Sequence, residues 1–340
     1  LSAHVGISGP HVSSRNSQGI VAVADPRHAI TDADVQRALE SARIFNVPNN
    51  REVIHVIPRY YVVDGHDNVS DPVGMYGSRL DLETHVVTCS SSAMQNLVHC
   101  VEGAGVHVES LILQPLASAE AVVAPEEMQH GAALIDIGGG TTDISVYRDG
   151  AVVHTAVLPV GGAHMTRDLV VALRVPHPAA EQAKRDYGHA IPSMIDEDEE
   201  IEIASFGSDG SKTVQRRLIA EVLQARTEEL LEMALAEIRR GAEPELISAG
   251  AILTGGAAAL PGIDLLAEEV LMLPARVGRP RHLAGLSDIL NDPAYATSVG
   301  LLRWALKEQE IMFRSTAAPV APLGGLMRRV AHLMRVVLPQ

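Results

Sequence analysis

Residues 133–147 read Ala-Leu-Ile-Asp-Ile-Gly-Gly-Gly-Thr-Thr-Asp-Ile-Ser-Val-Tyr, and this stretch decides the fold. An apolar strand ends in Asp136, three glycines turn the backbone, and a second strand starts after Asp143. Glycines without a Cβ allow consecutive main-chain N–H groups to close around an anion, which makes a concave phosphate nest. Threonine hydroxyls beside the nest can donate to phosphate oxygens. The pattern therefore predicts a phosphate-binding hairpin with the ligands Gly138, Gly139, Gly140, Thr141 and Thr142.

The aspartate at the end of the first strand has a predicted role of its own. Asp136 can hold Mg²⁺, most often through water, because this hard ion keeps much of its hydration shell. The alternative is an ordinary glycine-rich turn, which would account for a bare run of three glycines. The flanking strands and aspartates make the pattern narrower than that. It resembles the second phosphate loop of the actin, sugar-kinase and heat-shock-chaperone ATPase superfamily, and this resemblance implies ATP and Mg²⁺ as ligands.

Composition and charge set outer limits on structure and function. With 340 residues, 46% of them apolar, the chain can bury a sizeable core in two or more domains. A formal charge of −15 argues against a nucleic-acid partner, because phosphate backbones select basic surfaces. Cys89 and Cys100 lack CxxC or metal-ligand spacing, which predicts two buried thiols in a reduced cytosolic protein. No apolar run approaches the ~18 residues of a membrane span, and no signal peptide is visible.

Hydrophobic periodicity predicts mixed α/β structure along most of the chain. Before the hairpin, the pattern predicts a capped helix from Thr31, strands at 52–57, 59–63, 85–88 and 111–113, and helices through 94–101 and 116–122. After it, the pattern predicts a turn at Asp149-Gly150, helices at 162–173, 179–187, 217–240 and 294–304, and a buried strand at 251–254.

Two glycine pairs extend the predicted nucleotide site. Gly161-Gly162 opens a helix, where free N–H groups and the positive dipole end attract an anion, and Asp168 follows on the same helix. The alternative is a tight strand-to-helix turn. The second pair, Gly255-Gly256, follows a strand and allows a flat base to lie against the backbone. Its alternative is a packing joint between strand and helix.

Charged and polar residues add further candidates. Glu181 and Lys184 share one helical face, and a surface ion pair is the commoner explanation of this spacing. Within the superfamily, the resemblance implies that this pair reaches the ribose and adenine. It also implies that Gln114 orients the attacking water, which makes Gln114 and Asp136 the candidate catalytic residues. Without that resemblance, Gln114 is an ordinary polar residue at a strand end.

Taken together, the motifs resemble more closely the FtsA family of bacterial cell-division proteins. The resemblance runs from residue 3 to about 305. The stretches that carry it are Gly6–Gly9, His55–Pro58, Asp71–Gly74, Asn96–Val101, Leu116–Ser118, Asp136–Asp143, Leu253–Gly262 and Asn291–Thr297.

The resemblance implies an actin-like ATPase fold of two lobes with mixed sheets flanked by helices. The implied parts are the remainder of a first nucleotide lobe at 1–8 and 84–130, an inserted α/β module at 9–83, a second nucleotide lobe at 131–180 and 248–306, and a small lobe at 181–247. The family's first phosphate loop, Asp-x-Gly-Thr/Ser, is missing from the chain. We therefore expect an N-terminally truncated chain that binds ATP weakly or not at all.

The last residues differ in character from the rest of the chain. Residues 307–322 are predicted to be a linker, and 323–340 combine an apolar stripe at helical spacing with arginines. A basic amphipathic helix suits an anionic lipid interface. The alternatives are a helix docked on the body or bound to a partner. The predicted membrane residues are Leu323, Leu326, Met327, Arg328, Arg329, Val330, Leu333, Met334, Arg335 and Val337.

The function implied by the resemblance is a peripheral scaffold on the cytoplasmic side of the membrane at the division site. It would bind ATP, hydrolyse it slowly if at all, and tether the ring protein FtsZ. The implied partners are the acidic C-terminal tail of FtsZ, other copies of the chain, other division proteins and anionic lipid. Lys212 and Arg226, with Arg216 nearby, are the matching basic positions for the tail, and a solvated helix face is the common alternative. Two alternatives are a small-molecule kinase of the same superfamily and a pilus-assembly relative of FtsA.

Overall fold

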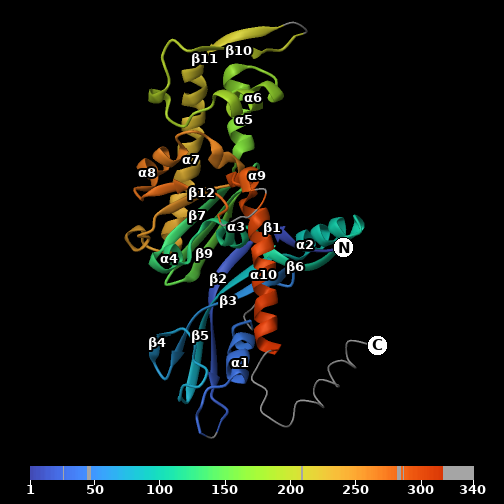
Figure 1. Ribbon diagram of the computed structural model, residues 1–340, viewed down its shortest axis with the longest axis vertical. Helices are drawn as coiled ribbons and strands as arrows, with labels where there is room; N and C mark the ends of the chain where they lie inside the picture. Colours follow the sequence, from blue (N-terminus) through green and yellow to red (C-terminus); the bar gives the residue numbers. More distant parts are fainter. Residues whose placement is uncertain (26, 44–46, 208–209, 282–284, 286, 317–340) are drawn as a thin grey trace.

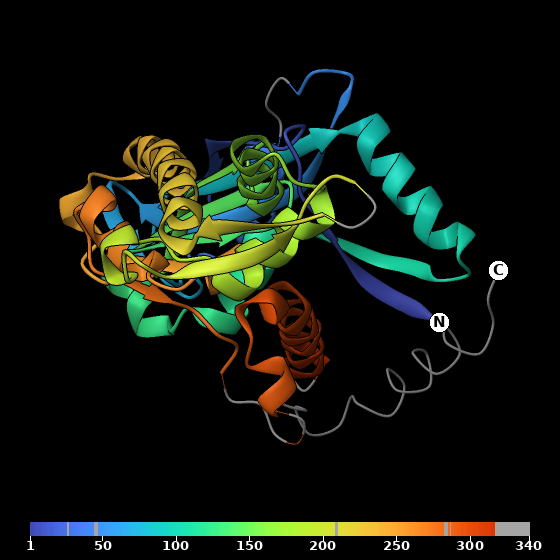
Figure 2. The same cartoon turned by 90° about the horizontal axis from the view of Figure 1, so that it is seen from above.

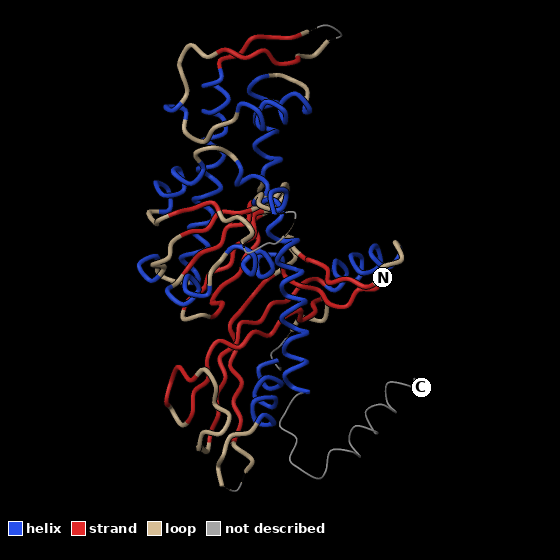
Figure 3. Tube along the Cα trace, viewed as in Figure 1, coloured by secondary structure: helices blue, strands red, loops and turns tan. Residues whose placement is uncertain are grey.

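The computed structural model describes residues 1–25, 27–43, 47–207, 210–281, 285 and 287–316. The molecule is elongated, with a β-rich module at one end and a small lobe that carries a hairpin at the other (Figures 1 and 3). Between them lies a body whose central sheet is covered by helices on both faces (Figure 1).

The module is an antiparallel sheet with one covering helix. Its strands lie in the order β2-β5-β3-β4, and the helix α1 packs against β2. A Cβ added at Gly19 of β2 would lie 2.1 Å from the Ala38 carbonyl oxygen, so glycine allows α1 to approach the sheet. The element bounds are β2 (Ser13–Ala22), α1 (Asp32–Arg43), β3 (Arg51–Val63), β4 (His66–Val69) and β5 (Arg79–Ser90).

A parallel strand pair and a helix project from the body (Figures 1 and 2). The pair is β1 (Ser2–Ile7) with β6 (His107–Leu113), and the helix is α2 (Ser91–Gly103). Every residue of α2 keeps part of its surface exposed, and Cys100 is exposed, whereas Cys89 on β5 is buried. The prediction of two buried thiols is therefore wrong for Cys100. The reason is that α2 packs on β6 and β5 from one side and faces solvent on the other.

The central sheet has the order β13-β12-β7-β8-β9. Its first three strands are parallel and its last three are antiparallel. Asp149 and Gly150 both have positive φ, at 53° and 76°, as the predicted two-residue turn between β8 and β9 requires. The bounds are β7 (Ala132–Ile137), β8 (Thr142–Arg148), β9 (Ala151–Leu158), β12 (Ala251–Thr254) and β13 (Ala275–Val277).

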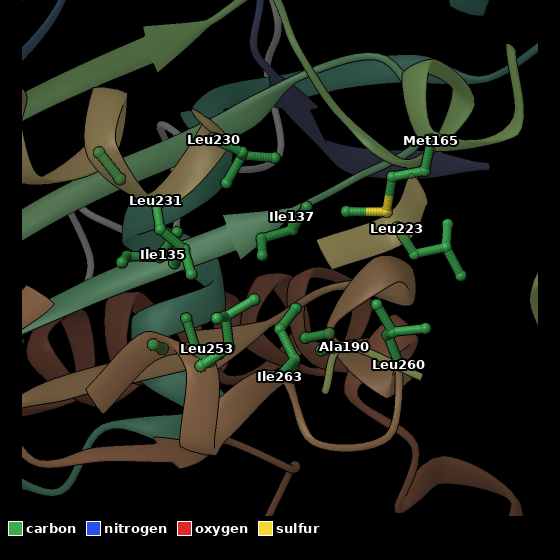
Figure 4. Close-up of a cluster of buried hydrophobic side chains, with 14 of the residues drawn as sticks. Ile135, Ile137, Met165, Ala190, Leu223, Leu230, Leu231, Leu253, Leu260 and Ile263 are labelled. Carbon is green, nitrogen blue, oxygen red and sulfur yellow. The ribbon is translucent and has the colours of Figure 1, made fainter. Parts of the chain in front are cut away.

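Alternate residues of the sheet enter two different cores. Ile135 and Ile137 share a cluster with Leu230 and Leu231 of α7 (Arg216–Gly241), and with α8 (Ile263–Leu271) (Figure 4). Leu134 instead belongs to a cluster with α3 (Gln114–Val122) and α10 (Ala296–Thr316). Burial of both faces explains why these strands are almost continuously apolar.

The small lobe is built from helices and a hairpin. This end of the molecule contains β10 (Glu200–Ala204), β11 (Ser211–Gln215), α6 (His177–Tyr187) and the first part of α7, and α5 (Gly162–Leu173) packs against α6 and α7. The remaining helical segments are α4 (Pro125–His130), η1 (Pro192–Met194), η2 (Pro244–Leu246), η3 (Gly256–Ala259), α9 (Ser287–Leu290) and η4 (Pro293–Tyr295).

The last described helix is longer than predicted. α10 continues to Thr316, so the predicted linker at 307–322 is wrong for residues 307–316. That segment contains neither glycine nor proline before Pro319, so nothing in it stops the helix. The predicted membrane residues at 323–337 lie outside the described residues. Within the described part of the chain, no helix combines the length and apolar character needed to cross a bilayer.

Candidate functional site

The predicted phosphate hairpin lies at the turn between β7 and β8. The Gly138 N–H donates to the Thr141 carbonyl at 2.9 Å, which closes the turn. A Cβ added at Gly139 or Gly140 would meet no atom of the described residues within 4 Å, so the tip faces open space. The carbonyls of Gly138 and Gly139 accept hydrogen bonds from Gly162 and Ala163, at 2.9 and 2.8 Å. The carbonyl oxygens that would repel a phosphate are thereby held by α5.

The glycine pair at the start of α5 has a different role from the predicted one. The Gly162 N–H is taken by the hairpin, and the Gly161 N–H donates to His164 Nδ1 at 3.2 Å. These N–H groups are therefore not available to an anion as the sequence predicted. A Cβ at Gly161 would lie 2.6 Å from the Gly138 carbonyl oxygen. Gly161 is needed because it allows α5 to approach the hairpin closely.

Two carboxyl groups lie side by side beneath the hairpin. Asp136 and Asp143 are paired across β7 and β8, and both are buried. Ser118 of α3 donates to Asp136 Oδ2 at 2.5 Å, Thr297 of α10 donates to the same oxygen at 3.2 Å, and Ser8 donates to Asp143. Side chains from four separate parts of the chain therefore converge on the end of β7.

Burial holds both carboxyl groups toward the protonated form. Burial raises the pKa of Asp136, and it raises the pKa of Asp143 to about 7, with the neighbouring Asp136 charge adding to the rise. A cation beside them would reverse this preference. Within the described residues, no group of three or more acidic, histidine or cysteine ligands surrounds a common point. The oxygen donors fit Mg²⁺ in the mode in which carboxylates share the ion with phosphate and water.

A cavity of about 560 Å³ opens beside the hairpin, between α5, α6 and η3. Its size suits a ligand as large as a nucleotide. Of the predicted nucleotide residues, it brings together Gly138, Gly139, Gly162, Glu181, Lys184 and Gly256. Sequence reasoning missed other residues on its wall, namely Ala163, Met165, His177, Arg185, Ala257, Ala259, Leu260, Pro261, Asp292 and Ala294. Six of them lie within Leu253–Gly262 and Asn291–Thr297, which carry the family resemblance, but most are small or apolar and did not by themselves indicate a ligand contact.

Other predicted nucleotide residues lie away from this cavity. Asp168 accepts two hydrogen bonds from Arg226, at 2.5 and 3.1 Å, in a separate groove between α5 and α7. Thr142 is fully buried and its hydroxyl donates to the Val160 carbonyl at 2.8 Å. In this structure both side chains have other hydrogen-bond partners, and their contacts with a nucleotide stay predictions. Gly255 lies against Asp136, because a Cβ added at Gly255 would lie 2.4 Å from Asp136 Oδ1.

The predicted partner-binding residues and Gln114 have local contacts. Arg226 pairs with Asp168 and Glu229. Arg216 donates to both carboxylate oxygens of Glu199 at 3.0 Å, and Lys212 donates to the Leu173 carbonyl. The charges of Arg216 and Arg226 are thus partly neutralised within the chain, whereas the contact of Lys212 is with an uncharged carbonyl. Gln114 begins α3 and packs against Gly6 of β1, where an added Cβ would lie 3.1 Å from the Gln114 side chain.

A buried histidine joins the module to the central sheet. His85 Nδ1 lies 2.8 Å from Asn16 Oδ1, and Nε2 lies 3.0 Å from Thr155 Oγ1 of β9. Asn16 uses its amide to donate to the Val153 carbonyl, so its oxygen accepts from the His85 Nδ1–H. Burial lowers the pKa of His85 to about 3, with the charges of His154, Arg59 and His55 adding to the shift.

We expect this histidine to make the fold acid-sensitive. At pH values below about 6.5, the ordinary pKa of histidine, His85 binds a proton in the unfolded chain but stays neutral in the folded chain. The contribution of His85 to the free energy of unfolding is therefore complete above pH 6.5. It falls as the pH drops toward 3, and about 2 kcal/mol of it is lost between pH 6.5 and 5. Urea unfolding of the wild type and of His85→Gln at both pH values checks this. Equal pH dependence in the two proteins would show that His85 is protonated in the folded state.

Family models and known proteins that match this chain cover most of its length. The family model described as cell division protein FtsA matches residues 133–300, and the model described as an SHS2 domain inserted in FtsA matches residues 9–88. Cell division protein FtsA of Pseudomonas aeruginosa is 41% identical over 308 residues, which cover 91% of this chain and 73% of that protein.

The chain belongs to the FtsA family. FtsA of Bacillus subtilis is 37% identical, with 92% of this chain and 70% of that protein covered. FtsA of Escherichia coli K12 is 34% identical, with 98% and 81% covered. The predicted family is thereby confirmed, and the chain is a member of a family of cell-division proteins.

Solved structures confirm the predicted actin-like ATPase fold of this FtsA-family chain. MreB5 of Spiroplasma citri bound to ADP superposes with a TM-score of 0.53 at 19% identity, over 67% of this chain and 68% of that one. The PilM–PilN type IV pilus biogenesis complex gives a TM-score of 0.56 at 20% identity, over 87% of this chain and 76% of that one. At these identities the likeness establishes the fold alone.

Proposed function

We propose that this FtsA-family chain is an actin-like scaffold that binds ATP, assembles with copies of itself and tethers FtsZ to the cytoplasmic face of the membrane. The observation that carries the nucleotide part is the cavity beside the hairpin. Gly139 of the hairpin, whose added Cβ would meet no atom of the described residues, lines it together with the backbone of Gly256. An actin-like relative of this fold, MreB5, was solved with ADP, which supports the same ligand class here.

Each part of the nucleotide has a proposed partner in the chain. Open amides of the hairpin would meet the phosphates, and Glu181 with Lys184 would face the ribose. The small residues of η3 would accept the flat base against the backbone. Mg²⁺, held at Asp136 mostly through water, would neutralise phosphate charge. Gln114 would orient water, and with this single polar group we expect hydrolysis to be slow.

Membrane binding is proposed from the sequence of residues 323–340. We expect a peptide of this segment to become helical on anionic vesicles, and Leu326→Glu with Leu333→Glu to abolish its binding. Each leucine contributes about 1.5–3 kcal/mol on burial, which outweighs about 1 kcal/mol for each arginine near anionic lipid. Vesicle co-sedimentation measures the effect, with Arg328→Gln as the variant that loses charge alone. Unchanged sedimentation of the double glutamate variant would reject a membrane role for the segment.

Binding of the acidic FtsZ tail is proposed for the basic positions of the small lobe. Lys212→Glu should weaken binding of an FtsZ C-terminal peptide, because reversing the charge of a half-buried lysine that faces an acidic peptide costs about 1–2 kcal/mol, or about 5- to 30-fold. Wild-type affinity should also fall as salt rises. Fluorescence anisotropy of the labelled peptide measures both.

Arg226 needs a separate control in that experiment, because Arg226→Glu would place a third carboxylate beside Asp168 and Glu229. Arg226→Gln removes its charge without adding this repulsion. Peptide binding that is independent of salt and unaffected by Lys212→Glu would remove these residues from the proposed surface.

A further inference from the structure

Thr166 occupies a buried position between the two helices that line the cavity. It lies on the first part of α5, and none of its surface is exposed to solvent. Lys184 of α6 donates to its hydroxyl oxygen at 2.8 Å. The hydroxyl in turn donates to Glu181 Oε2 and lies 3.1 Å from the Gly162 carbonyl oxygen. One small side chain thus connects α5 with Glu181 and Lys184 of α6.

Lys184 has an acceptor for each proton of its ammonium group. Besides Thr166, it donates to the Gly162 carbonyl at 3.1 Å and to Glu181 Oε2 at 2.7 Å. An ammonium group has three donors and no acceptor, so this geometry uses all of them. Lys184 could donate to a ligand only by giving up one of these bonds. We therefore assign the ligand contact to Glu181.

Glu181 is held in its charged form with one oxygen engaged. Burial raises the pKa of Glu181, but hydrogen bonds from Lys184 and Thr166 outweigh that effect and lower it. Both bonds end on Oε2, and the side chain keeps 38% of its surface exposed. A carboxylate only accepts hydrogen bonds, and phosphate oxygens at neutral pH also only accept them. The two groups therefore do not bond to each other. In a nucleotide, the hydroxyls of the ribose are the donors that suit it.

The same network reaches the phosphate end of the site. Gly162 and Ala163 donate to the carbonyls of Gly138 and Gly139 in the hairpin. Gly162 also accepts from Lys184 through its own carbonyl. The hairpin, the first turn of α5 and the charged face of α6 are therefore joined by a continuous set of hydrogen bonds.

We propose that Thr166 is a positioning residue that holds Glu181 toward the ribose hydroxyls. This proposal rests on the proposed nucleotide function. Removing its hydroxyl leaves Lys184 and Glu181 with one partner fewer and frees the Glu181 side chain to rotate. Affinity for the ribose is then lost, whereas the hairpin and the base-binding backbone are unchanged. The effect is specific to the sugar.

The experiment compares Thr166→Val, which keeps the shape without the hydroxyl, with Thr166→Ser, which keeps the hydroxyl. Affinities for ADP, 2′-deoxy-ADP and pyrophosphate are measured by calorimetry or NMR titration at millimolar ligand, with each protein in the form that also carries the family's first phosphate loop. We expect wild type and Thr166→Ser to prefer ADP over its deoxy analogue by about fivefold, the effect of one hydrogen bond of about 1 kcal/mol. In Thr166→Val this preference should disappear, with pyrophosphate affinity unchanged.

A second readout does not depend on ligand binding. The pKa of the Glu181 carboxyl, followed by carbon-13 NMR, should rise in Thr166→Val and stay unchanged in Thr166→Ser. If the valine variant does not fold by circular dichroism, Thr166→Cys takes its place, since a thiol is a weak hydrogen-bond donor. Absence of ADP binding by the wild type refutes the proposed function. A retained ribose preference, or an equal loss for all three ligands with an unchanged Glu181 pKa, refutes the role of Thr166.

Discussion

Gly300→Ala should destabilise the fold by at least about 3 kcal/mol, because a rigid backbone contact leaves no room for a methyl group. Gly300 lies on α10 where that helix crosses α3, and an added Cβ would lie 1.7 Å from the Ala117 carbonyl oxygen. The obstacle is backbone, so no side chain can rotate to relieve the clash. The helices would have to move apart. Urea unfolding followed by circular dichroism measures the loss.

A matched control separates this clash from the general effect of alanine in a helix. Gly103 also lies in a helix, and its added Cβ would meet no atom of the described residues within 4 Å. Gly103→Ala should therefore stabilise the protein by up to about 1 kcal/mol through helix propensity. If both variants unfold at the same urea concentration, the helices are further apart than the structure places them.

The Gly300 clash has a functional consequence as well. α3 carries Ser118 and α10 carries Thr297, and both hydroxyls hold Asp136. Separation of the two helices would withdraw one of these donors. We therefore expect any folded fraction of Gly300→Ala to lose nucleotide affinity, although Gly300 does not line the cavity.

Local patterns in the sequence were sufficient for the hairpin and the long helix α7. The strand–glycine–strand pattern fixes a turn, and a period near 3.6 over more than twenty residues leaves little alternative to a helix. The pairing of Glu181 with Lys184 was also predictable, because three residues along a helix bring the side chains to one face. These features depend on residues that are close in the chain.

The contacts that spacing along the chain did not indicate depend on distant partners. Asp168 is held by Arg226, which lies on another helix. The N–H group of Gly162 is taken by the Gly138 carbonyl of the hairpin. Spacing along the chain contains no information on such pairs. A glycine pair at a helix start looks the same whether its amides bind an anion or a neighbouring loop.

One strand that the sequence analysis did not predict carries a local signal. Residues 200–204 alternate glutamate and isoleucine, the pattern of a half-buried strand. In the structure they form β10, with Ile201 and Ile203 buried at 8% and 5% exposure. Burial of the two isoleucines compensates for the exposed charges that precede and separate them.

Asp136→Ala should lower the affinity for Mg²⁺-ATP by tenfold or more, which corresponds to about 1.4 kcal/mol or more of binding free energy. It should change the affinity for metal-free ADP by less than about threefold. The carboxylate acts on phosphate through the ion, so its loss matters only when the ion is present. The measurement is calorimetry on a chain that also carries the family's first phosphate loop. Asp136→Asn keeps an acceptor for Ser118 and Thr297, which separates loss of charge from loss of structure.

Gly256→Val provides the contrasting variant for the same measurement. Its nearest neighbour, the Cβ of Ala294, lies 3.8 Å from an added Cβ, so the backbone should tolerate valine while the side chain fills the cavity. Gly255 could not serve, because it has a φ of 86° and its added Cβ meets Asp136. Valine at 256 should weaken ATP and ADP equally, with or without metal, because it blocks the base. If Asp136→Ala also weakens both nucleotides equally, Asp136 acts on the shape of the hairpin, and the proposed Mg²⁺ site is wrong.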